Sequence, residues 1–305
     1  MTAASSTPAH YPELLAAGTD LLERRRSGIS RGPLSELPRT DDNTQIVWKD
    51  DGAAVIGGMV AIAEVAGDRR VAGAYPGLAA AAGGLATPQI RSVATIGGNL
   101  AQRSRCWYYR NPHMACLKKG GDTCPARAGN HLYGVIFDLG PCVAPHPSTL
   151  AAALLAYDAT VTTSLRADIG IATLLGDGRD GTRDHTLQAG EHIVSIDLPR
   201  PLAGERAGYR RAIARTYAEW PLVEAVARIV PEGDRVGLAR IAVGGVAPVP
   251  LRLPAVEDAL AGKRLDETTI AAVAKLAAVG AKPLAMTGYK VPLIEGLIAD
   301  LLGRL

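Results

Sequence analysis

The sequence is poor in aromatic residues, has no long apolar run and carries almost no excess of charge of either sign. Aromatic side chains make up 4% of its 305 residues, with a single Phe. No run of about 18 apolar residues occurs, so the sequence predicts no membrane-spanning helix. The 33 basic and 30 acidic side chains leave a formal charge of +3, which is too small an excess to indicate a nucleic-acid or membrane-surface partner. We therefore expect a soluble protein with neither partner.

The start of the chain also gives no indication of export. Residues 1–11 have neither the basic start nor the apolar core that an export signal requires, so we expect a cytoplasmic protein. The rest of the composition is typical of globular proteins, with 48% hydrophobic and 21% charged residues. At about 150 residues per domain, the length predicts two domains or three small ones.

Apolar patterning in the first half predicts short strands followed by helices. The first unit is a strand, a turn and a helix, at 14–16, 17–20 and 21–26. The further strands and helices are expected at 46–48, 53–56, 62–86 (two helices, broken at 75–76), 150–157 and 160–165. A turn-rich stretch then indicates a domain boundary, at 168–184.

The last third of the chain has strands first and helices afterwards. Alternation of apolar and polar residues predicts a small antiparallel sheet from strands at 193–198, 208–215, 222–230 and 236–246. Helical spacing of apolar residues follows at 253–262, 268–281 and 291–302. This order is typical of an α+β domain.

The four cysteines are crowded into one part of the sequence. They are Cys106, Cys116, Cys124 and Cys142. Residues 103–142 are dense in Arg, Lys, Gly, Pro and Cys and have neither helical nor strand periodicity, which predicts a long functional loop. Disulfides are one interpretation, but a chain without an export signal is expected to mature among reductants, which favours metal ligation.

Two glycine turns are candidate sites for an anionic ligand. They are the segments 18–20, Gly-Thr-Asp, and 95–100, Thr-Ile-Gly-Gly-Asn-Leu. Glycine lacks a Cβ, so its backbone N–H can approach phosphate oxygens, and Thr and Asn side chains add further donors. Either turn alone would be an ordinary turn in most proteins.

Together, these segments resemble a known family, the FAD-binding medium subunits of molybdenum hydroxylases, which includes those of xanthine dehydrogenase and carbon monoxide dehydrogenase. Residues 17–21, Ala-Gly-Thr-Asp-Leu, resemble the first FAD loop, which normally has Gly where Ala17 stands. Residues 75–99 resemble the signature leading into the second FAD loop. Residues 240–248 and 292–305 resemble the family's C-terminal domain.

The resemblance implies an α+β fold in two main parts. The first is a two-part FAD-binding domain of the PCMH/vanillyl-alcohol-oxidase-like type, with subdomains expected at 1–48 and at 49–180, the latter including the loop at 103–142. The second is a C-terminal α+β domain of the CO-dehydrogenase-flavoprotein type, expected at 188–305. FAD would lie at the junction of these parts.

The resemblance also implies which residues contact FAD. Thr149 stands where the family usually has Asp after Pro-Ser, Arg211 where a Lys faces the flavin ring, and Ile193 where an aliphatic residue packs on the isoalloxazine. The expected FAD-binding residues are Leu15, Ala16, Ala17, Gly18, Thr19, Asp20, Leu21, Thr95, Gly97, Gly98, Asn99, Thr149, Ile193 and Arg211. No residue is assigned a catalytic role, since the six histidines show no ligand spacing.

The cysteine loop resembles an insertion found in one branch of the family. That branch contains bacterial aldehyde oxidoreductases and 4-hydroxybenzoyl-CoA reductase, and its medium subunit holds an extra 4Fe-4S cluster. The resemblance implies that all four cysteines ligate this cluster. Zinc is the rival metal, although structural zinc sites usually place cysteines in closely spaced pairs. The basic residues of the loop would offset the charge of a thiolate-bound cluster, or they simply form a solvated basic loop.

The function implied is electron transfer within a heteromeric enzyme. The expected partners are a large subunit with the molybdenum cofactor, a small 2Fe-2S subunit and a terminal acceptor, which would be NAD, a quinone, oxygen or ferredoxin. An aldehyde is the expected substrate, with purines and aromatic thioesters as alternatives. A periplasmic location is expected only if a partner subunit carries the export signal. The competing hypothesis is a noncatalytic scaffold with zinc in the cysteine loop and no functional flavin.

Overall fold

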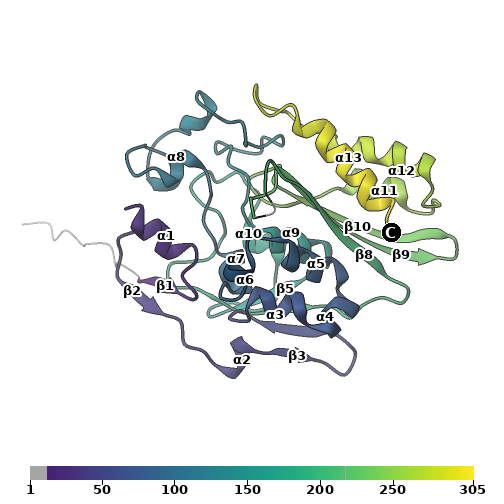
Figure 1. Cartoon of the computed structure of the whole chain (residues 1–305), viewed down its shortest axis with the longest axis horizontal. Coiled ribbons are helices and arrows are strands. Elements are labelled where there is room, and N and C mark those ends of the chain that lie inside the picture. Colours follow the sequence, from purple (N-terminus) through teal and green to yellow (C-terminus); the bar gives the residue numbers. More distant parts are fainter. Residues whose placement is uncertain (1–11, 217) are drawn as a thin grey trace, which may run out of the picture.

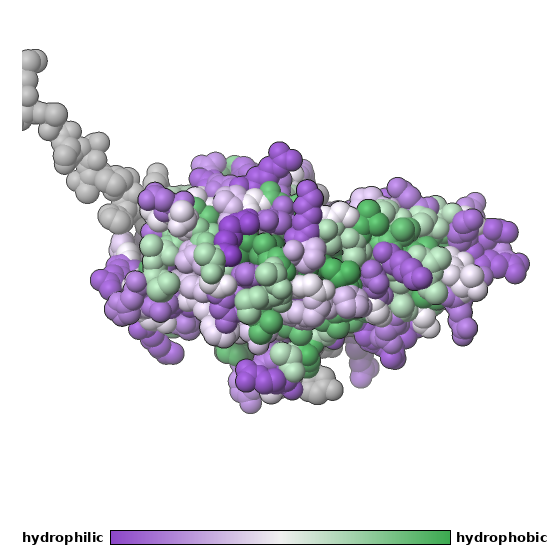
Figure 2. All heavy atoms as spheres, turned by 90° about the horizontal axis from the view of Figure 1, so that it is seen from above, coloured by the Kyte–Doolittle hydropathy of each residue, from purple (hydrophilic) through white to green (hydrophobic). Residues whose placement is uncertain are grey.

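The computed structural model describes residues 12–216 and 218–305. These residues form alternating layers of strands and helices (Figure 1). A five-stranded sheet is followed by a helical layer, a four-stranded sheet and a second helical layer. A two-stranded sheet and the cysteine-containing loop lie beside these layers. In the view of Figure 2, hydrophobic side chains gather across the middle of one face, between more hydrophilic ends.

The first unit along the chain is small. Strand β1 (Glu13–Leu15) pairs in parallel with β2 (Leu34–Glu36), and α1 (Leu21–Arg26) lies between them in the sequence. The turn before α1 requires Gly18, whose φ of +75° lies in the left-handed region that favours glycine. The strand, turn and helix expected here are confirmed.

The N-terminal domain is built on an antiparallel sheet with the strand order β3-β4-β7-β5-β6. Its strands are β3 (Ile46–Trp48), β4 (Ala54–Gly57), β5 (Thr160–Thr163), β6 (Ile169–Gly170) and β7 (Ile193–Leu198). The short helices of this domain are α2 (Asp41–Thr44), α6 (Pro88–Arg91), α7 (Ile96–Leu100) and α10 (Ile171–Leu175).

The C-terminal domain has a four-stranded sheet with the order β11-β10-β9-β8. The strands are β8 (Arg206–Ala212), β9 (Val223–Glu232), β10 (Arg235–Gly244) and β11 (Leu251–Arg252). One face is covered by α11 (Pro254–Leu260), α12 (Glu267–Ala274), the 3-10 helix η3 (Lys275–Ala278) and α13 (Lys290–Leu302). The α+β fold expected from the sequence is confirmed.

The helical layer between the two sheets joins the domains. It contains α3 (Ile62–Gly67), α4 (Arg69–Ala74), α5 (Pro76–Gly84) and α9 (Thr149–Ala156). Every residue of α9 is buried, and the helix contacts β9 and β10 as well as the N-terminal core. A helix that is apolar on all sides must be covered on all sides. The alanines of α5 and α9 allow the two domains to pack closely.

Three expectations about the elements are wrong. Residues 193–198 do not join the C-terminal sheet, because β7 pairs with β4 and β5 in the N-terminal sheet. Alternation predicts a strand but not its neighbours. The stretch 62–86 forms three helices instead of two, since Asp68 caps a new helix with its carboxylate. The turn-rich stretch 168–184 contains β6 and α10.

The cysteine loop is largely irregular, as expected. Between α7 and α9 it contains only α8 (Trp107–Arg110) and two 3-10 turns, η1 (Leu117–Lys119) and η2 (Pro125–Arg127). It forms a lobe next to α1 (Figure 1). No helix within 12–216 or 218–305 combines the length and apolarity needed to cross a bilayer.

Candidate functional site

The second glycine turn is held in place by its own side chains and by Gly58. The hydroxyl of Thr95 caps α7 by accepting a hydrogen bond from the N–H of Gly98 at 3.1 Å. The N–H of Gly97 donates to the carbonyl of Gly58 at 2.9 Å, and a Cβ on Gly97 would lie 2.8 Å from that oxygen. Gly97 is therefore required for backbone packing, whereas Gly98 faces a cavity.

The two glycine turns meet at one cavity of about 180 Å³. Thr19 and Asp20 from the first turn lie in its wall together with Gly98 and Asn99 from the second. Further wall residues predicted from the sequence are Thr149 and Arg211. The cavity thus brings together residues from the N-terminal unit, the second glycine turn, helix α9 and strand β8.

The other predicted FAD-binding residues lie outside this wall. They are Leu15, Ala16, Ala17, Gly18, Leu21, Thr95, Gly97 and Ile193. Gly18, Thr95 and Gly97 shape the turns, and Leu21 is buried in α1. Ile193 is buried in the N-terminal core because the alternation of β7 turns its side chain inward. The structure therefore places Ile193 in the core instead of at the cavity.

A larger cavity of about 550 Å³ adjoins the first. The two cavities share the wall residues Arg105, Pro147, Glu219, Trp220 and Pro221. One side of the larger cavity comes from the cysteine loop and includes Cys106, Trp107 and Tyr133, and the other comes from the C-terminal domain and includes Glu224 and Lys290. This cavity was not predicted from the sequence.

One sequence signal could have drawn attention to the larger cavity. The chain has only three Trp residues, and two of them, Trp107 and Trp220, lie in its wall. Trp107 lies against Tyr133, with ring centroids 6.0 Å apart, and the Arg105 guanidinium lies 4.5 Å from the Trp220 ring centroid. In a sequence poor in aromatics, tryptophans in segments without helical or strand periodicity indicate a binding surface more than a core.

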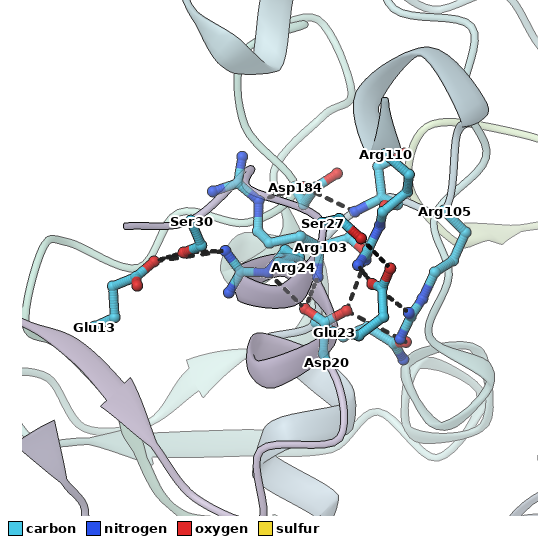
Figure 3. A network of polar contacts seen from close by, with 12 residues as sticks. Glu13, Asp20, Glu23, Arg24, Ser27, Ser30, Arg103, Arg105, Arg110 and Asp184 are labelled. Atoms are coloured by element: carbon cyan, nitrogen blue, oxygen red, sulfur yellow. Dashed lines mark hydrogen bonds and ion pairs between the residues drawn. The ribbon is translucent and has the colours of Figure 1, made fainter. Parts of the chain in front are cut away.

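Asp20 does not point a free carboxylate into the smaller cavity. Its carboxylate is paired with Arg24 at 3.1 Å, Arg105 at 3.0 Å and Arg110 at 2.6 Å, and it accepts a hydrogen bond from the Arg103 backbone N–H at 3.1 Å (Figure 3). Burial raises the pKa of Asp20, but the charges of Arg105 and Arg110 outweigh this effect and hold the pKa below its usual value. Asp20 therefore attaches the first glycine turn to the cysteine loop.

A second buried carboxylate attaches the cysteine loop on its other side. Asp184 pairs with Arg103 at 2.6 Å and with Lys118 at 2.9 Å. Burial raises its pKa, yet the charges of Lys118 and Arg103 outweigh burial, so the pKa lies well below its usual value. The sequence analysis treated these basic residues as a group that offsets a cluster's charge, whereas Arg103 and Lys118 are paired with protein carboxylates.

The four cysteines are free thiols that lie near one another. Cys116 and Cys142 are buried, and Cys106 and Cys124 are half-buried. A hydrogen bond from the Cys142 thiol lowers the pKa of Cys124, and the backbone N–H groups of Val143, Ala126 and Arg127 also point at its sulfur. Burial raises the pKa of Cys106, and the nearby Cys116 and Cys124 raise it further. Within 12–216 and 218–305, no three His, Cys, Asp or Glu side chains are arranged around a single metal ion.

His146 and Ser148 connect the cysteine loop to the second glycine turn. The Ser148 backbone N–H donates to His146 Nδ1 at 3.2 Å, and Nε2 lies 3.1 Å from the Asp184 carbonyl oxygen. Both contacts are satisfied only by a neutral ring with its proton on Nε2. The Ser148 hydroxyl caps α9 and donates to Asn99 Oδ1 at 2.7 Å. The start of α9 thus orients an amide in the wall of the smaller cavity.

Comparison with known families covers both domains. Residues 7–201 match the family described as the FAD binding domain in molybdopterin dehydrogenase, and residues 207–305 match the CO dehydrogenase flavoprotein C-terminal domain. The chain belongs to the family of FAD-binding medium subunits of molybdenum hydroxylases. The resemblance seen in the sequence is thereby confirmed at the level of this family, and so is the two-part fold.

One relative and two solved structures are similar to this chain over most of its length. The aldehyde oxidoreductase FAD-binding subunit PaoB of Escherichia coli (strain K12) is 32% identical over 306 residues, covering 96% of this chain and 91% of that protein. Carbon monoxide dehydrogenase from Hydrogenophaga pseudoflava has a chain of the same fold, with a TM-score of 0.73, 22% identity and coverage of 96% and 88%. Quinoline 2-oxidoreductase from Pseudomonas putida 86 gives a TM-score of 0.73, 21% identity and coverage of 95% and 88%.

The environment of His146 predicts a loss of stability in mild acid. Burial lowers the pKa of His146 from 6.5 to about 4, so the unfolded chain binds a proton at higher pH than the folded chain does. The free energy of unfolding therefore decreases as the pH falls from about 6.5 towards 4, and His146 accounts for up to about 3 kcal/mol of this decrease. The measurement is the free energy of unfolding in urea at several pH values, followed by circular dichroism.

The matched variants are His146→Gln, which cannot titrate, and His113→Gln, in an exposed part of the cysteine loop. His146→Gln should flatten the pH dependence in part, since burial also lowers the pKa of His185 to about 4. His113→Gln should retain the wild-type profile. An unchanged slope in His146→Gln would contradict the prediction.

Proposed function

We propose that this chain is the FAD- and 4Fe-4S-containing electron-transfer subunit of a heteromeric molybdenum hydroxylase that oxidises an aldehyde. The observation that carries the proposal is the meeting of both glycine turns at one cavity, with the cysteine loop attached next to it. FAD suits this position because it accepts single electrons from iron–sulfur centres and releases two. The relation to an aldehyde oxidoreductase subunit supports an aldehyde as substrate.

The residues around the smaller cavity fit the anionic part of FAD. Gly98 leaves its side of the wall without a side chain, so an anionic group can approach the backbone of α7 there. Thr19 and Asn99 provide polar side chains, and Arg105 provides positive charge where the two cavities meet. A cation and polar side chains beside a wall that lacks a side chain can hold a pyrophosphate. The adjoining larger cavity gives room for the rest of the molecule.

The donors of the cysteine loop fit an iron–sulfur cluster. A zinc ion takes all of its ligands at about 2.3 Å from one point. A 4Fe-4S cluster takes one thiolate on each of four iron atoms, so its cysteines need only to surround a common volume. Four neighbouring free thiols, with backbone N–H groups aimed at Cys124, meet this requirement. The hydrogen bond to Cys124 and burial raise the pKa of Cys142, and the charge of Lys118 opposes them.

The remaining parts of the proposal concern partners and location. Electrons would come from a large molybdenum subunit through a small 2Fe-2S subunit and leave to NAD, a quinone, oxygen or ferredoxin. This chain supplies no substrate-activating residues in the proposed scheme, so it works only within the complex. We propose a cytoplasmic location, and a periplasmic one only if a partner subunit carries the export signal.

Replacing Gly98 tests whether FAD binds in the smaller cavity. In Gly98→Asp, a Cβ would lie 2.9 Å from Thr95 Oγ1 and a carboxylate would enter the cavity, so bound FAD should be lost. Gly73→Asp is the matched control, because Gly73 is exposed and a Cβ there meets nothing within 4 Å. FAD per chain is measured from the visible absorbance of the purified proteins. Full FAD content in Gly98→Asp would show that the cavity is assigned wrongly.

Replacing Cys124 tests whether the metal site and the FAD site are independent of each other. Cys124 lies in the wall of neither cavity. Replacing its thiolate by a hydroxyl in Cys124→Ser should sharply lower bound iron and leave FAD in place. Ala115→Ser, on the exposed side of the same loop, is the control and should keep both. Iron, zinc and flavin are measured side by side.

Each outcome of this experiment distinguishes a hypothesis. Undiminished iron in Cys124→Ser would exclude Cys124 as a ligand. Equal loss of iron and flavin would show that the loop is part of the FAD site. Zinc in place of iron in the wild-type protein, without flavin, would favour the noncatalytic scaffold.

A further inference from the structure

Glu224 is a buried carboxyl group located between the two cavities. It lies on β9, is 1% exposed and forms part of the wall of the larger cavity. Its neighbours in the sheet are Arg211 on β8 and Gly244 on β10. A Cβ on Gly244 would lie 2.5 Å from Glu224 Oε1, so glycine at this position makes room for the carboxyl group.

Two hydroxyl groups hold the carboxyl group of Glu224. The Tyr209 hydroxyl donates to Glu224 Oε2 at 2.8 Å, and the Thr149 side chain is also hydrogen-bonded to it. Thr149 lies in the wall of the smaller cavity, as does Arg211. The hydrogen bond between Glu224 and Thr149 therefore links the C-terminal sheet to the start of α9, directly beside the proposed FAD site.

Among residues 12–216 and 218–305, the groups packed against Glu224 include one cation, two hydroxyl groups and a glycine. Arg211 is its charged neighbour in the sheet, while α9 and β10 present Thr149 and Gly244. Among the described residues, the charged and titratable groups elsewhere in the cavity wall are Arg105, Cys106, Tyr108, His131, Tyr133, His146, Arg215, Glu219 and Lys290. The Lys290 ammonium is already bound by the carbonyls of Gly245 at 2.7 Å and Tyr133 at 3.1 Å.

Because Glu224 is buried among these groups, a nearby charge changes its protonation. Burial raises its pKa to about 7, against the opposing effect of the hydrogen bonds from Thr149 and Tyr209 and of Arg211. A second negative charge brought close to a buried carboxylate disfavours the ionised form further. At neutral pH the group is thus near the midpoint of its titration.

We propose that Glu224 takes up a proton when FAD bound at this site is reduced and releases it when the FAD is oxidised. Reduction by two electrons from the partner iron–sulfur centres, with uptake of one proton, would leave bound FAD with one negative charge. A second proton from solvent, entering through the larger cavity, binds the Glu224 carboxylate and balances that charge. Oxidation by the acceptor would remove two electrons and the proton on the flavin, together as a hydride when the acceptor is NAD, and Glu224 would release its own proton to solvent. The inference rests on the proposed function, because it requires FAD at this site.

The test is the pH dependence of the flavin's midpoint potential in the full chain purified with FAD. Above pH 7, a flavin that takes one proton with two electrons has half the slope of potential against pH that a two-proton couple has. The wild-type protein should show up to twice the slope of Glu224→Gln between pH 7 and 8. Gln keeps the size and hydrogen-bonding capacity of the side chain but cannot ionise. Glu64→Gln, on an exposed position of α3, should retain the wild-type slope.

A second variant, Tyr209→Phe, tests the inference even if Glu224→Gln does not fold. Tyr209→Phe removes one hydrogen bond to the carboxylate, so the steeper part of the curve should begin at higher pH. Equal slopes in the wild type and Glu224→Gln would overturn the inference, and so would a Tyr209→Phe curve that superimposes on that of the wild type. A wild-type chain without bound FAD would instead contradict the proposed function itself.

Discussion

The ion pairs of Asp20 are the interaction on which the candidate site depends. One carboxylate holds Arg24 in its own helix and Arg105 and Arg110 in the cysteine loop (Figure 3). Because buried guanidinium groups are costly without a counter-charge, the first glycine turn and the cysteine loop can pack only together. Arg105 then lies at the junction of the two cavities. The residue implied as an FAD contact by resemblance is thus the residue that positions a cation for the site.

A second set of contacts continues from the cysteine loop into the FAD-binding domain. Asp184 fixes Arg103 and Lys118, and its backbone carbonyl faces the neutral ring of His146. The Nδ1 atom of that ring accepts a hydrogen bond from the Ser148 N–H at the start of α9. The Ser148 hydroxyl in turn donates to the side chain of Asn99 and orients it. Side chains far apart in the sequence therefore determine where the cavity walls lie. Because α9 is packed between both sheets, its first residue, Thr149, is also fixed in place, and Thr149 is hydrogen-bonded to Glu224.

Local features were predictable from the sequence, and long-range ones were not. The backbone conformations at Gly18 and at 95–99 could be predicted, because glycine and capping residues determine the conformation of only a few neighbouring residues. The strand at 193–198 was placed in the wrong sheet, since its alternation says nothing about pairing. Glu224 and Asp184 were missed because no local pattern shows that a carboxyl group will be buried or will meet arginines from another segment. The cysteines stood out by their crowding, while the carboxylates that position their loop did not.

Through its ion pairs, Asp20 couples the first glycine turn to the cysteine loop. Hydrogen–deuterium exchange of Asp20→Asn tests it most directly, with Asp180→Asn, an exposed carboxylate, as control. Asn keeps the shape of Asp but removes one of the two carboxylates that pair with Arg105 and Arg110, the other being that of Glu23. Amides in α1 and in residues 103–118 should exchange roughly tenfold faster or more, while those of β9 and β10 stay as in the wild type. Unchanged exchange at 103–118, or equal acceleration throughout the chain, would contradict the claim.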